Sequence, residues 1–324
     1  MRISNGTRKS TQNAQGKDAQ IKIFYIGGFS KSYDTEVYIA HALRELGVDV
    51  KCWDESLNLT LTMLLERIDD FKPDFVLLSK NRRYGKPLIE RLRGRYLTVS
   101  WLFDLYHSLP REMNSTRSVK DSPFFADRVF MSDGGEFLAK KETLRQGIHE
   151  PEAKLLKRDY KYDVAFIGSN TYVKRHQMIE FLKETYGKRF VHYGMGGLPE
   201  TRGMELNEIL ATSKVIVGDS VPADRYWSNR IYEVLGRGGF LLHPRVNGLE
   251  KEFRYYEHFI PFEHGNLDQI KEITDYFITH DEEREKIRLA GHKFCKENYT
   301  YKIRCQNLLQ KLTGKNEPKS IKAI

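Results

Sequence analysis

Short apolar runs alternate with amphipathic segments along the first half of the chain. The run 21–28, IKIFYIGG, ends in two glycines, and residues 37–47 then place apolar side chains at helical spacing before the stop at Gly47. Further apolar runs are predicted strands, at 48–53, 74–79, 95–103 and 127–132, and helices are predicted near 60–70 and 135–146. Strands that alternate with helices favour a parallel sheet. We therefore predict an α/β domain over residues 21–150, preceded by a disordered basic tail at 1–20.

The same alternation restarts after a polar stretch, 147–161, that contains Pro151 and has weak periodicity. We interpret 151–161 as a linker between domains. The strands predicted after it lie at 162–169, 189–194, 214–220, 239–244 and 258–262, and the helices at 172–186, 204–212, 225–237 and 267–279. The pattern thus predicts a second α/β domain over 162–298. The helical segment 299–313 is expected to cross back to the first domain, and 314–324 to form a flexible tail.

Composition and charge narrow the class of protein. The 324 residues suit two domains, and a hydrophobic content of 40% is ample for their cores. No apolar run has the roughly 18 to 20 residues that a membrane span needs, and the N-terminus lacks the apolar core of a secretory signal. Three cysteines far apart form neither a disulfide framework nor a metal-binding pair, so a cytoplasmic location is expected. The net charge of +9 indicates an anionic partner without distinguishing nucleic acid, nucleotide and membrane surface.

The stretch 219–244, DSVPADRYWSNRIYEVLGRGGFLLHP, follows a predicted strand. Doubly wound sheets bind ligands at the carboxyl ends of their strands, so this stretch is the first candidate for a binding site. Its helix is expected to begin near Pro222, where free backbone amides would face an anion. Arg230, Glu233 and Arg237 would share one helix face, with the acid between two arginines. The alternative is a solvated, salt-bridged helix face.

The motif SNRIYEVLGRGGFLLHP, together with YDVAFIGS before it and ENYTYKIRCQNLL after it, resembles the group 1 glycosyltransferases, specifically their spore-maturation (CgeB-like) branch. The resemblance runs from about Ile21 to Leu312. It implies the GT-B fold, in which two Rossmann-like domains face a central cleft. It also implies that Glu233 binds the ribose hydroxyls of a nucleotide-diphosphate sugar, expected to be a UDP-sugar, and that Arg230 faces the diphosphate. The sequence departs from the Glu-x7-Glu pattern of many retaining members, since Arg225 stands where the first acid would be, so the stereochemistry stays open.

Two further strand ends of the second domain are candidates for donor binding. Gly168 and Ser169 close the run YDVAFIGS, and Lys174 and Arg175 begin the next helix. Backbone amides and fixed positive charge suit a pyrophosphate leaving group, although Lys174 and Arg175 could equally form an exposed basic face. Gly194, in HYGMGG, is a weaker candidate for contact with the base. The sequence has no Asp-x-Asp motif, which favours a metal-independent transferase, with no metal site and no cofactor.

In the first domain, the segment SWLFDLYH ends a predicted strand and resembles a Trp-x-x-Asp stretch of the same branch. Its Asp104 and His107 are candidates for the base that takes the acceptor's proton, although acids at strand ends also cap helices. The other candidate bases are Asp34, Glu36 and Asp133. Gly28 could approach the donor phosphates or the acceptor, but its loop is no Walker A motif.

The segment 80–95, KNRRYGKPLIERLRGR, contains a single acid, Glu90, and follows a predicted strand of the acceptor-side domain. Arg82 and Arg83 are candidate contacts for an anionic acceptor, such as DNA with hydroxymethylated bases, and Tyr84 could stack on a base or a sugar. The alternative is a solvated basic helix and loop. For the whole protein, the alternative to an enzyme is a non-catalytic nucleic-acid-binding or assembly protein on a GT-B-like scaffold.

Overall fold

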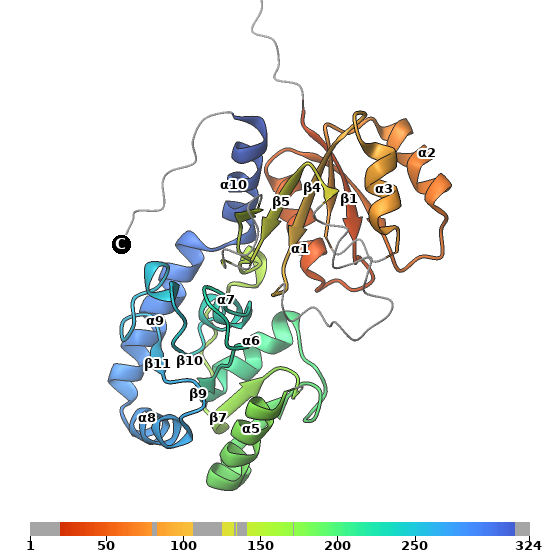
Figure 1. Ribbon diagram of the computed structural model, residues 1–324. Coiled ribbons are helices and arrows are strands. Elements are labelled where there is room, and N and C mark those ends of the chain that lie inside the picture. The colour runs from red at the N-terminus through yellow and green to blue at the C-terminus, as the bar shows by residue number, and fades with distance from the viewer. Residues whose placement is uncertain are drawn as a thin grey trace, which may run out of the picture.

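The computed structural model of the protein describes residues 20–79, 83–105, 125–132, 134, 141–170 and 172–314. It consists of two α/β domains, one above the other in Figure 1. The described part of the first domain has six parallel strands in the order β2-β1-β3-β4-β5-β6. Their bounds are β1 (Lys22–Gly27), β2 (Asp49–Asp54), β3 (Phe75–Leu78), β4 (Leu97–Leu102), β5 (Arg128–Met131) and β6 (Lys141–Thr143).

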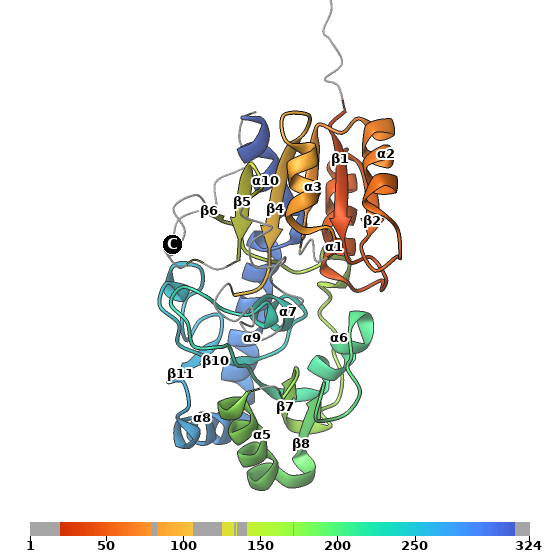
Figure 2. The same cartoon turned by 45° about the vertical axis from the view of Figure 1, so that its right-hand side comes forward.

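Helices cover both faces of this sheet. The helices α2 (Leu61–Phe71) and α3 (Gly85–Leu92) pack on one face, where Leu64, Ile68 and Leu88 are fully buried. The other face is covered by α1 (Thr35–Glu45) and, from the far end of the chain, by α10 (Tyr301–Thr313), whose Cys305 and Leu308 belong to the same hydrophobic cluster as α1. The C-terminal helix therefore completes the core of the first domain, as Figure 2 shows.

The second domain has a parallel sheet whose described strands follow the order β11-β10-β9-β7-β8. These strands are β7 (Tyr162–Ile167), β8 (Phe190–Tyr193), β9 (Ser213–Val217), β10 (Leu241–Pro244) and β11 (Ile260–Phe262). One face carries α5 (Val173–Tyr186) and α8 (Leu267–Thr279), and the other carries α6 (Gly203–Ala211) and α7 (Arg230–Gly236). The helix α9 (Asp281–Asn298) packs along α7 and leads toward the first domain. The predicted fold class, two Rossmann-like domains with parallel sheets, is confirmed.

The chain passes between the domains at 144–161 and again at 298–301, and these passages are hydrogen-bonded to each other. The amide of Ile148 donates to the carbonyl of Tyr299 at 2.9 Å, and the amide of Tyr301 donates to the carbonyl of Ile148 at 3.0 Å. The backbones approach so closely that a Cβ atom on Gly147 would lie 2.5 Å from the carbonyl oxygen of Tyr299. This contact fixes the relative position of the two domains.

Two predicted helices are wrong in part. Residues 141–143, predicted to be helical, form the edge strand β6, because the carbonyl of Leu144 accepts the indole hydrogen of Trp101 at 2.9 Å and its amide pairs with Met131. The predicted helix 225–237 begins only at Arg230. Arg225 has a φ of 52°, a left-handed conformation that no helix continues. The backbone amides near Pro222, which were expected to bind an anion at a helix start, therefore do not belong to a helix.

None of the described helices is long and apolar enough to cross a lipid bilayer. The three cysteines are free thiols. Cys295 and Cys305 are buried in the cores of the second and first domain, where burial raises the pKa of each thiol. Both act as small apolar side chains in these positions.

We predict that Gly147→Ala destabilises the protein, because its methyl group would overlap the backbone of Tyr299 at the domain crossing. Overpacking of this kind costs about 1 to 3 kcal/mol of unfolding free energy, measurable by urea denaturation. Gly28→Ala is the control, since the nearest atom to its Cβ lies 4.0 Å away. Equal stability of the two variants would contradict the crossing contact.

Candidate functional site

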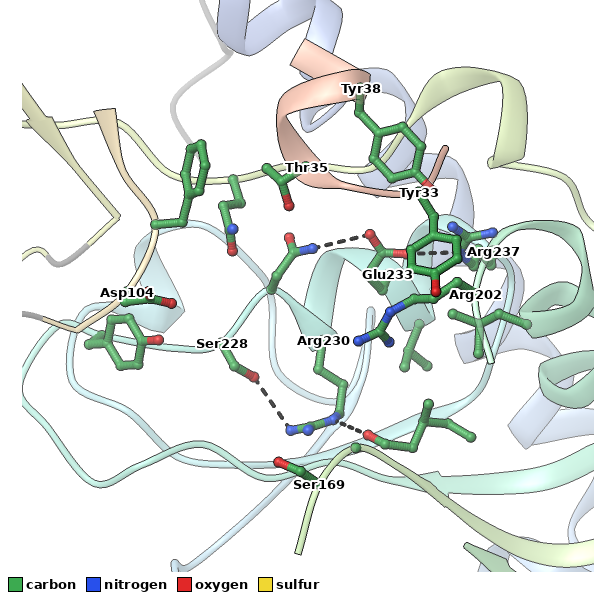
Figure 3. A pocket seen from close by; sticks show the side chains of 18 residues that line it. Tyr33, Thr35, Tyr38, Asp104, Ser169, Arg202, Ser228, Arg230, Glu233 and Arg237 are labelled. Carbon is green, nitrogen blue, oxygen red and sulfur yellow. Dashed lines mark hydrogen bonds and ion pairs between the residues drawn. The ribbon is translucent and has the colours of Figure 1, made fainter. Parts of the chain in front are cut away.

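A cavity of about 360 Å³ lies between the two domains, where the carboxyl ends of both sheets meet. Figure 3 shows its lining from close by. The first domain and the linker contribute Tyr33, Thr35, Tyr38, Phe103, Asp104 and Gln146, and the second domain contributes Gly168, Ser169, Arg202, Ser228, Asn229, Arg230, Glu233 and Arg237, among others. We call this cavity the interdomain pocket.

Glu233 enters the interdomain pocket from the first turn of α7 with both carboxylate oxygens fixed. Asn229 donates from Nδ2 to its Oε1 at 3.1 Å, and Arg237 donates from Nε to its Oε2 at 2.8 Å. Arg237 is almost fully buried, with 1% of its side chain exposed, whereas 20% of Glu233 is exposed. The helix face that carries Glu233 and Arg237 is therefore largely buried and not solvated. Arg237 presents Glu233 to the pocket as an oriented acceptor of hydrogen bonds.

Arg237 also binds groups from other parts of the chain. Its Nη2 forms an ion pair with Glu152 of the linker, and its Nη1 donates to Asn207 on α6. Tyr38 of α1 donates its hydroxyl to both oxygens of Glu152 at 3.0 Å. The first domain, the linker and α7 thus meet at one buried guanidinium.

The ring of His149 stacks on Tyr38, with centroids 4.2 Å apart. Burial lowers the pKa of His149 to about 4, so the imidazole is neutral at physiological pH. Burial, with the charge of Glu152 adding to it, raises the pKa of Tyr38, which keeps its hydroxyl hydrogen available to donate. At neutral pH, Tyr38 therefore donates its hydroxyl hydrogen to Glu152, and the His149 ring beside it carries no charge.

Arg230 turns away from Glu233. Of the two arginines expected beside this acid, only Arg237 pairs with it. The Nε atom of Arg230 donates to the carbonyl of Ile167 at 2.7 Å and its Nη1 to the carbonyl of Asp219. Its Nη2 fills the space where a side chain on Gly168 would lie, and Gly168 has a φ of 144° that only glycine adopts easily. Burial, followed by the nearby charge of Arg175, lowers the pKa of Arg230 to about 10, so it stays cationic at neutral pH. Arg230, Gly168 and Ser169 together line one end of the interdomain pocket.

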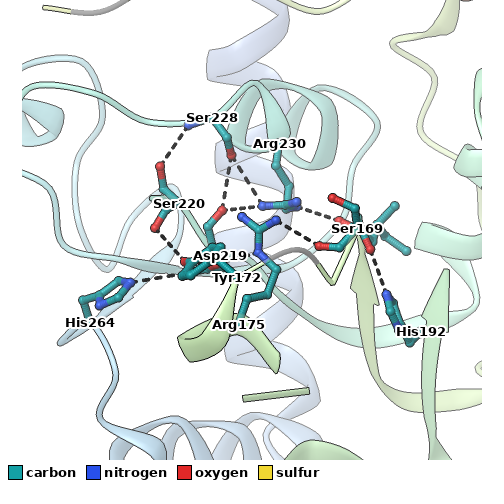
Figure 4. Close-up of polar contacts among 11 residues, drawn as sticks. Ser169, Tyr172, Arg175, His192, Asp219, Ser220, Ser228, Arg230 and His264 are labelled. Atoms are coloured by element: carbon teal, nitrogen blue, oxygen red, sulfur yellow. Dashed lines mark hydrogen bonds and ion pairs between the residues drawn. The ribbon is translucent and has the colours of Figure 1, made fainter. Parts of the chain in front are cut away.

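Arg175 lies behind this end of the pocket and not in its lining. Its Nε pairs with Asp219 at 2.8 Å, and its Nη1 donates to the carbonyl of Ser169 at 2.9 Å (Figure 4). Tyr172 and His264 also contact the Asp219 carboxylate. Arg175 therefore ties the loop after β7 to the loop after β9. Lys174 is exposed, next to Gly265, and likewise lies outside the pocket lining.

Gly194 packs against the loop of Gly168. Its φ is 124°, and a Cβ atom on it would lie 2.5 Å from the carbonyl oxygen of Gly168. It supports the loop from behind, outside the lining of the interdomain pocket.

On the first-domain side, Asp104 lines the interdomain pocket just after β4, across from Glu233 and Arg237 (Figure 3). His107, Arg82 and Asp133 lie outside the described residues. Gly28 and Arg83 line a separate cavity of the first domain. Sequence reasoning missed several polar pocket residues, namely Tyr33, Thr35, Tyr38, Gln146, Arg202, Tyr226, Ser228 and Asn229. Among these, Ser228 and Asn229, which precede Arg230 in the motif, carried a usable signal.

The loop between β9 and α7 is hydrogen-bonded to residues of the first domain. The carbonyl of Arg225 accepts hydrogen bonds from the amide of Gly134 at 3.0 Å and from Nη2 of Arg145 at 2.9 Å. The guanidinium of Arg145 lies 3.4 Å from the ring centre of Trp227. The side chain of Arg225 is 42% exposed beside Asp224. Position 225 thus contributes its carbonyl to the domain contact, and no carboxylate.

We predict that the Asp219 network makes stability depend on pH. Burial alone would raise the pKa of Asp219, but hydrogen bonds from His264, Tyr172 and Arg175 lower it from 3.8 to about 2. The ionised form thus contributes stability above about pH 4, lost as the pH falls toward 2. We expect Asp219→Asn to lower the free energy of unfolding by about 2 kcal/mol at pH 7. Urea titrations at several pH values measure this, and the difference from the wild type should shrink below about pH 4. Asp224→Asn, exposed on the same loop, is the control; a pH-independent loss in Asp219→Asn would contradict the assignment.

The comparisons with known proteins agree with this architecture. Residues 174–310 match the family model described as glycosyl transferase-like. No curated protein sequence matches the chain. Among solved structures, HepE of Anabaena in complex with UDP-glucose has a TM-score of 0.64 at 11% identity, covering 91% of this chain and 100% of that one.

Two other structures are similar over nearly their whole length. An alpha-glucosyltransferase in complex with UDP-glucose and DNA containing an abasic site has a TM-score of 0.68 at 10% identity, covering 90% of this chain and 99% of that one. Sucrose-phosphate synthase from Thermosynechococcus elongatus has a TM-score of 0.63 at 9% identity, covering 91% and 99%. At these identities the structures show the shared GT-B fold alone. The chain thus has the GT-B fold, and its residues 174–310 match a glycosyl transferase-like domain.

Proposed function

We propose that the protein transfers a sugar from a UDP-sugar to an acceptor hydroxyl, with the donor bound in the interdomain pocket. The acceptor oxygen bonds to the anomeric carbon, and the bond from that carbon to the β-phosphate oxygen breaks. UDP leaves with the electron pair, and the hydroxyl proton passes to a base. The observation that carries this proposal is the oriented carboxylate of Glu233 in the same pocket as the cationic Arg230.

The nucleoside end of the donor would lie at Glu233. A carboxylate can accept hydrogen bonds from two vicinal hydroxyls at once, and Arg237 and Asn229 hold that of Glu233 in place before any ligand binds. Preorganisation of this kind lowers the entropy cost of binding. The UDP and UDP-glucose bound to the HepE structures support UDP as the nucleotide.

The diphosphate would lie between Arg230 and Arg202, next to Gly168 and Ser169. Arg230 donates to backbone carbonyls near the Asp219 carboxylate, and Arg202, which pairs with Glu200, lines the same pocket from the loop before α6. Fixed guanidinium groups stabilise the charge that develops on a leaving diphosphate. We propose on this basis that the transfer is metal-independent and that Arg202 joins the donor-binding residues.

Asp104 is the proposed base. It faces the donor-binding residues from the first domain, where an acceptor would approach. A carboxylate in this position can take the proton of the attacking hydroxyl.

The basic segment 80–95 bears on the question of an anionic acceptor. Its described cations do not share one surface: Arg83 binds the loop before α2, Lys86 pairs with Glu90, and Arg95 pairs with Asp69 at the opposite end of the sheet. The DNA in the alpha-glucosyltransferase structure is the observation in favour of a nucleic acid acceptor.

Two finer assignments rest on sequence. We propose membership of the CgeB-like branch on the motif SNRIYEVLGRGG, whose Arg230 and Glu233 line the interdomain pocket. We propose a cytoplasmic location because a nucleotide sugar is the donor and the three cysteines are free thiols.

We predict that Glu233→Gln removes at least about half of the stabilisation by UDP. At about 100 times Kd, UDP should stabilise the wild-type protein by about 2.7 kcal/mol. The amide keeps the shape of the side chain but loses one acceptor and the charge, so Kd should rise roughly tenfold or more. Thermal unfolding with and without UDP measures this. Glu285→Gln is the matched control, since Glu285 also pairs with an arginine, Arg288, on α9. An unchanged stabilisation of Glu233→Gln by UDP would show that the donor assignment is wrong.

We predict that Asp104→Asn lowers kcat for transfer by roughly 10² to 10⁴ while UDP binding stays as in the wild type. A screen of UDP-sugars with mass detection of UDP release first identifies the donor. Asp74→Asn serves as the control, because Asp74 accepts from the amide of Lys22 at the opposite end of the sheet. A kcat near that of wild type in Asp104→Asn would show that another group is the base.

A further inference from the structure

The contacts that hold Glu233 continue through Arg237 and Glu152 to Tyr38. Glu233 lies on α7 and Arg237 at its end, Glu152 lies in the short turn Glu150–Glu152 of the linker, and Tyr38 lies on α1. Tyr38 and Arg237 are at the same end of the interdomain pocket as Glu233, away from Ser169 (Figure 3). We call these linked side chains of Tyr38, Glu152, Arg237 and Glu233 the Arg237 network.

The guanidinium of Arg237 is fixed from several directions. Its Nε donates to Glu233 at 2.8 Å, its Nη1 donates to the carbonyl of Gly203 at 2.8 Å, and its Nη2 pairs with Glu152. Because a guanidinium carries its donors in a rigid planar fork, it cannot turn toward one partner without loosening its bond to another. Burial would lower the pKa of Arg237, but the charges of Glu233 and Glu152 raise it, so the fork stays cationic. The position of Glu152 therefore helps to set the direction in which Glu233 is held.

Glu152 is held in turn by both domains. The hydroxyl of Tyr38 donates to its two carboxylate oxygens at 3.0 Å each, and Nδ2 of Asn207 on α6 donates to its backbone carbonyl at 2.9 Å. The ring of Tyr38 belongs to the hydrophobic cluster of the first domain and stacks on His149, so its hydroxyl has little freedom to move. The hydroxyl hydrogen of Tyr38 is thus used by Glu152 and is not available to donate to a ligand.

We infer that Glu152 and Tyr38 are positioning residues of the nucleotide site. They hold Arg237, and through it the Glu233 carboxylate, in the direction that accepts the ribose hydroxyls of UDP. This inference rests on the proposed function and adds to it residues that act through Glu233. Because the strength of a hydrogen bond depends on its direction, a carboxylate that is free to turn binds two vicinal hydroxyls less tightly. The affinity of the second domain for UDP then depends on a hydroxyl group of the first domain.

The test is a double-mutant cycle on the Kd for UDP, measured by isothermal titration calorimetry with the full chain. Tyr38→Phe keeps the ring and removes the hydroxyl, and Kd should rise roughly threefold to tenfold, as for residues in one hydrogen-bond network. In a Glu233→Gln background the same change should alter Kd by less than about twofold, because the carboxylate that Tyr38 positions is gone. Tyr186→Phe is the matched control and should bind UDP like the wild type, since buried Tyr186 also donates its hydroxyl to a carboxylate, that of Asp275, at 3.0 Å.

Glu152→Gln tests the middle of the Arg237 network. It removes the charge that pairs with Arg237, so Kd for UDP should rise at least as much as in Tyr38→Phe, and again only where Glu233 is present. Its control is Glu208→Gln, which loses an ion pair with Arg158 on the surface of α6. Thermal unfolding without UDP checks that each variant is folded, and Tyr38→Phe decides the test if Glu152→Gln does not fold.

A Kd of Tyr38→Phe within about twofold of the wild type would overturn the inference. So would a loss that persists in full in the Glu233→Gln background, because Tyr38 would then contact the ligand itself. The cycle separates these failures from that of the proposed function. If Glu233→Gln weakens UDP binding and Tyr38→Phe does not, the donor assignment stands and the positioning role is wrong. If Glu233→Gln binds UDP as tightly as the wild type, or the wild type does not bind UDP, both are wrong.

Discussion

The buried guanidinium of Arg237 is the interaction on which the site depends. It lies between two carboxylates, Glu233 of the interdomain pocket and Glu152 of the linker, with 1% of its side chain exposed. Removing one partner of such a buried group is strongly destabilising, because a desolvated charge is left without compensation. The orientation of the Glu233 carboxylate is therefore linked to the position of the linker. Tyr38 extends that link to the first domain through Glu152.

A second set of contacts fixes the opposite side of the pocket. Arg145 of the first domain pairs with Glu252 at 2.9 Å and donates to the carbonyl of Arg225. Arg304, at the start of α10, approaches the same Glu252 and donates to the carbonyl of Gln146. With the crossing at Gly147, these contacts surround the interdomain pocket with buried ion pairs and backbone hydrogen bonds. These contacts hold the residues around the pocket in place, and preorganised groups favour recognition.

Most of the fold was predictable from the sequence because its signals are local. Parallel strands buried on both faces give continuous apolar runs, and helices such as α8 show clear periodicity, so both sheets were found. The errors arise where distant residues decide. Arg225 has a left-handed conformation, and its carbonyl accepts hydrogen bonds from Gly134 and Arg145. No local sequence pattern predicts that contact.

The same distinction applies to the site. Glu233 and Arg230 were found through a motif, and both line the pocket. Their directions were not predictable, because the space that receives Arg230 is created by Gly168, sixty-two positions earlier in the chain. Lys174 and Arg175 satisfied the local signal of cations at a helix start, yet one is exposed and the other is buried against Asp219. Local spacing cannot tell a cation that binds a ligand from one that binds the protein.

For the same reason, the net charge of +9 does not by itself indicate a charged ligand. The buried guanidinium groups of Arg145, Arg175 and Arg237 are bound to carboxylates, so they describe the architecture and not a ligand. What remains informative is local charge. Arg230 places a cationic guanidinium at one end of the interdomain pocket. A cation held at one end of the interdomain pocket suits the binding of an anionic group there.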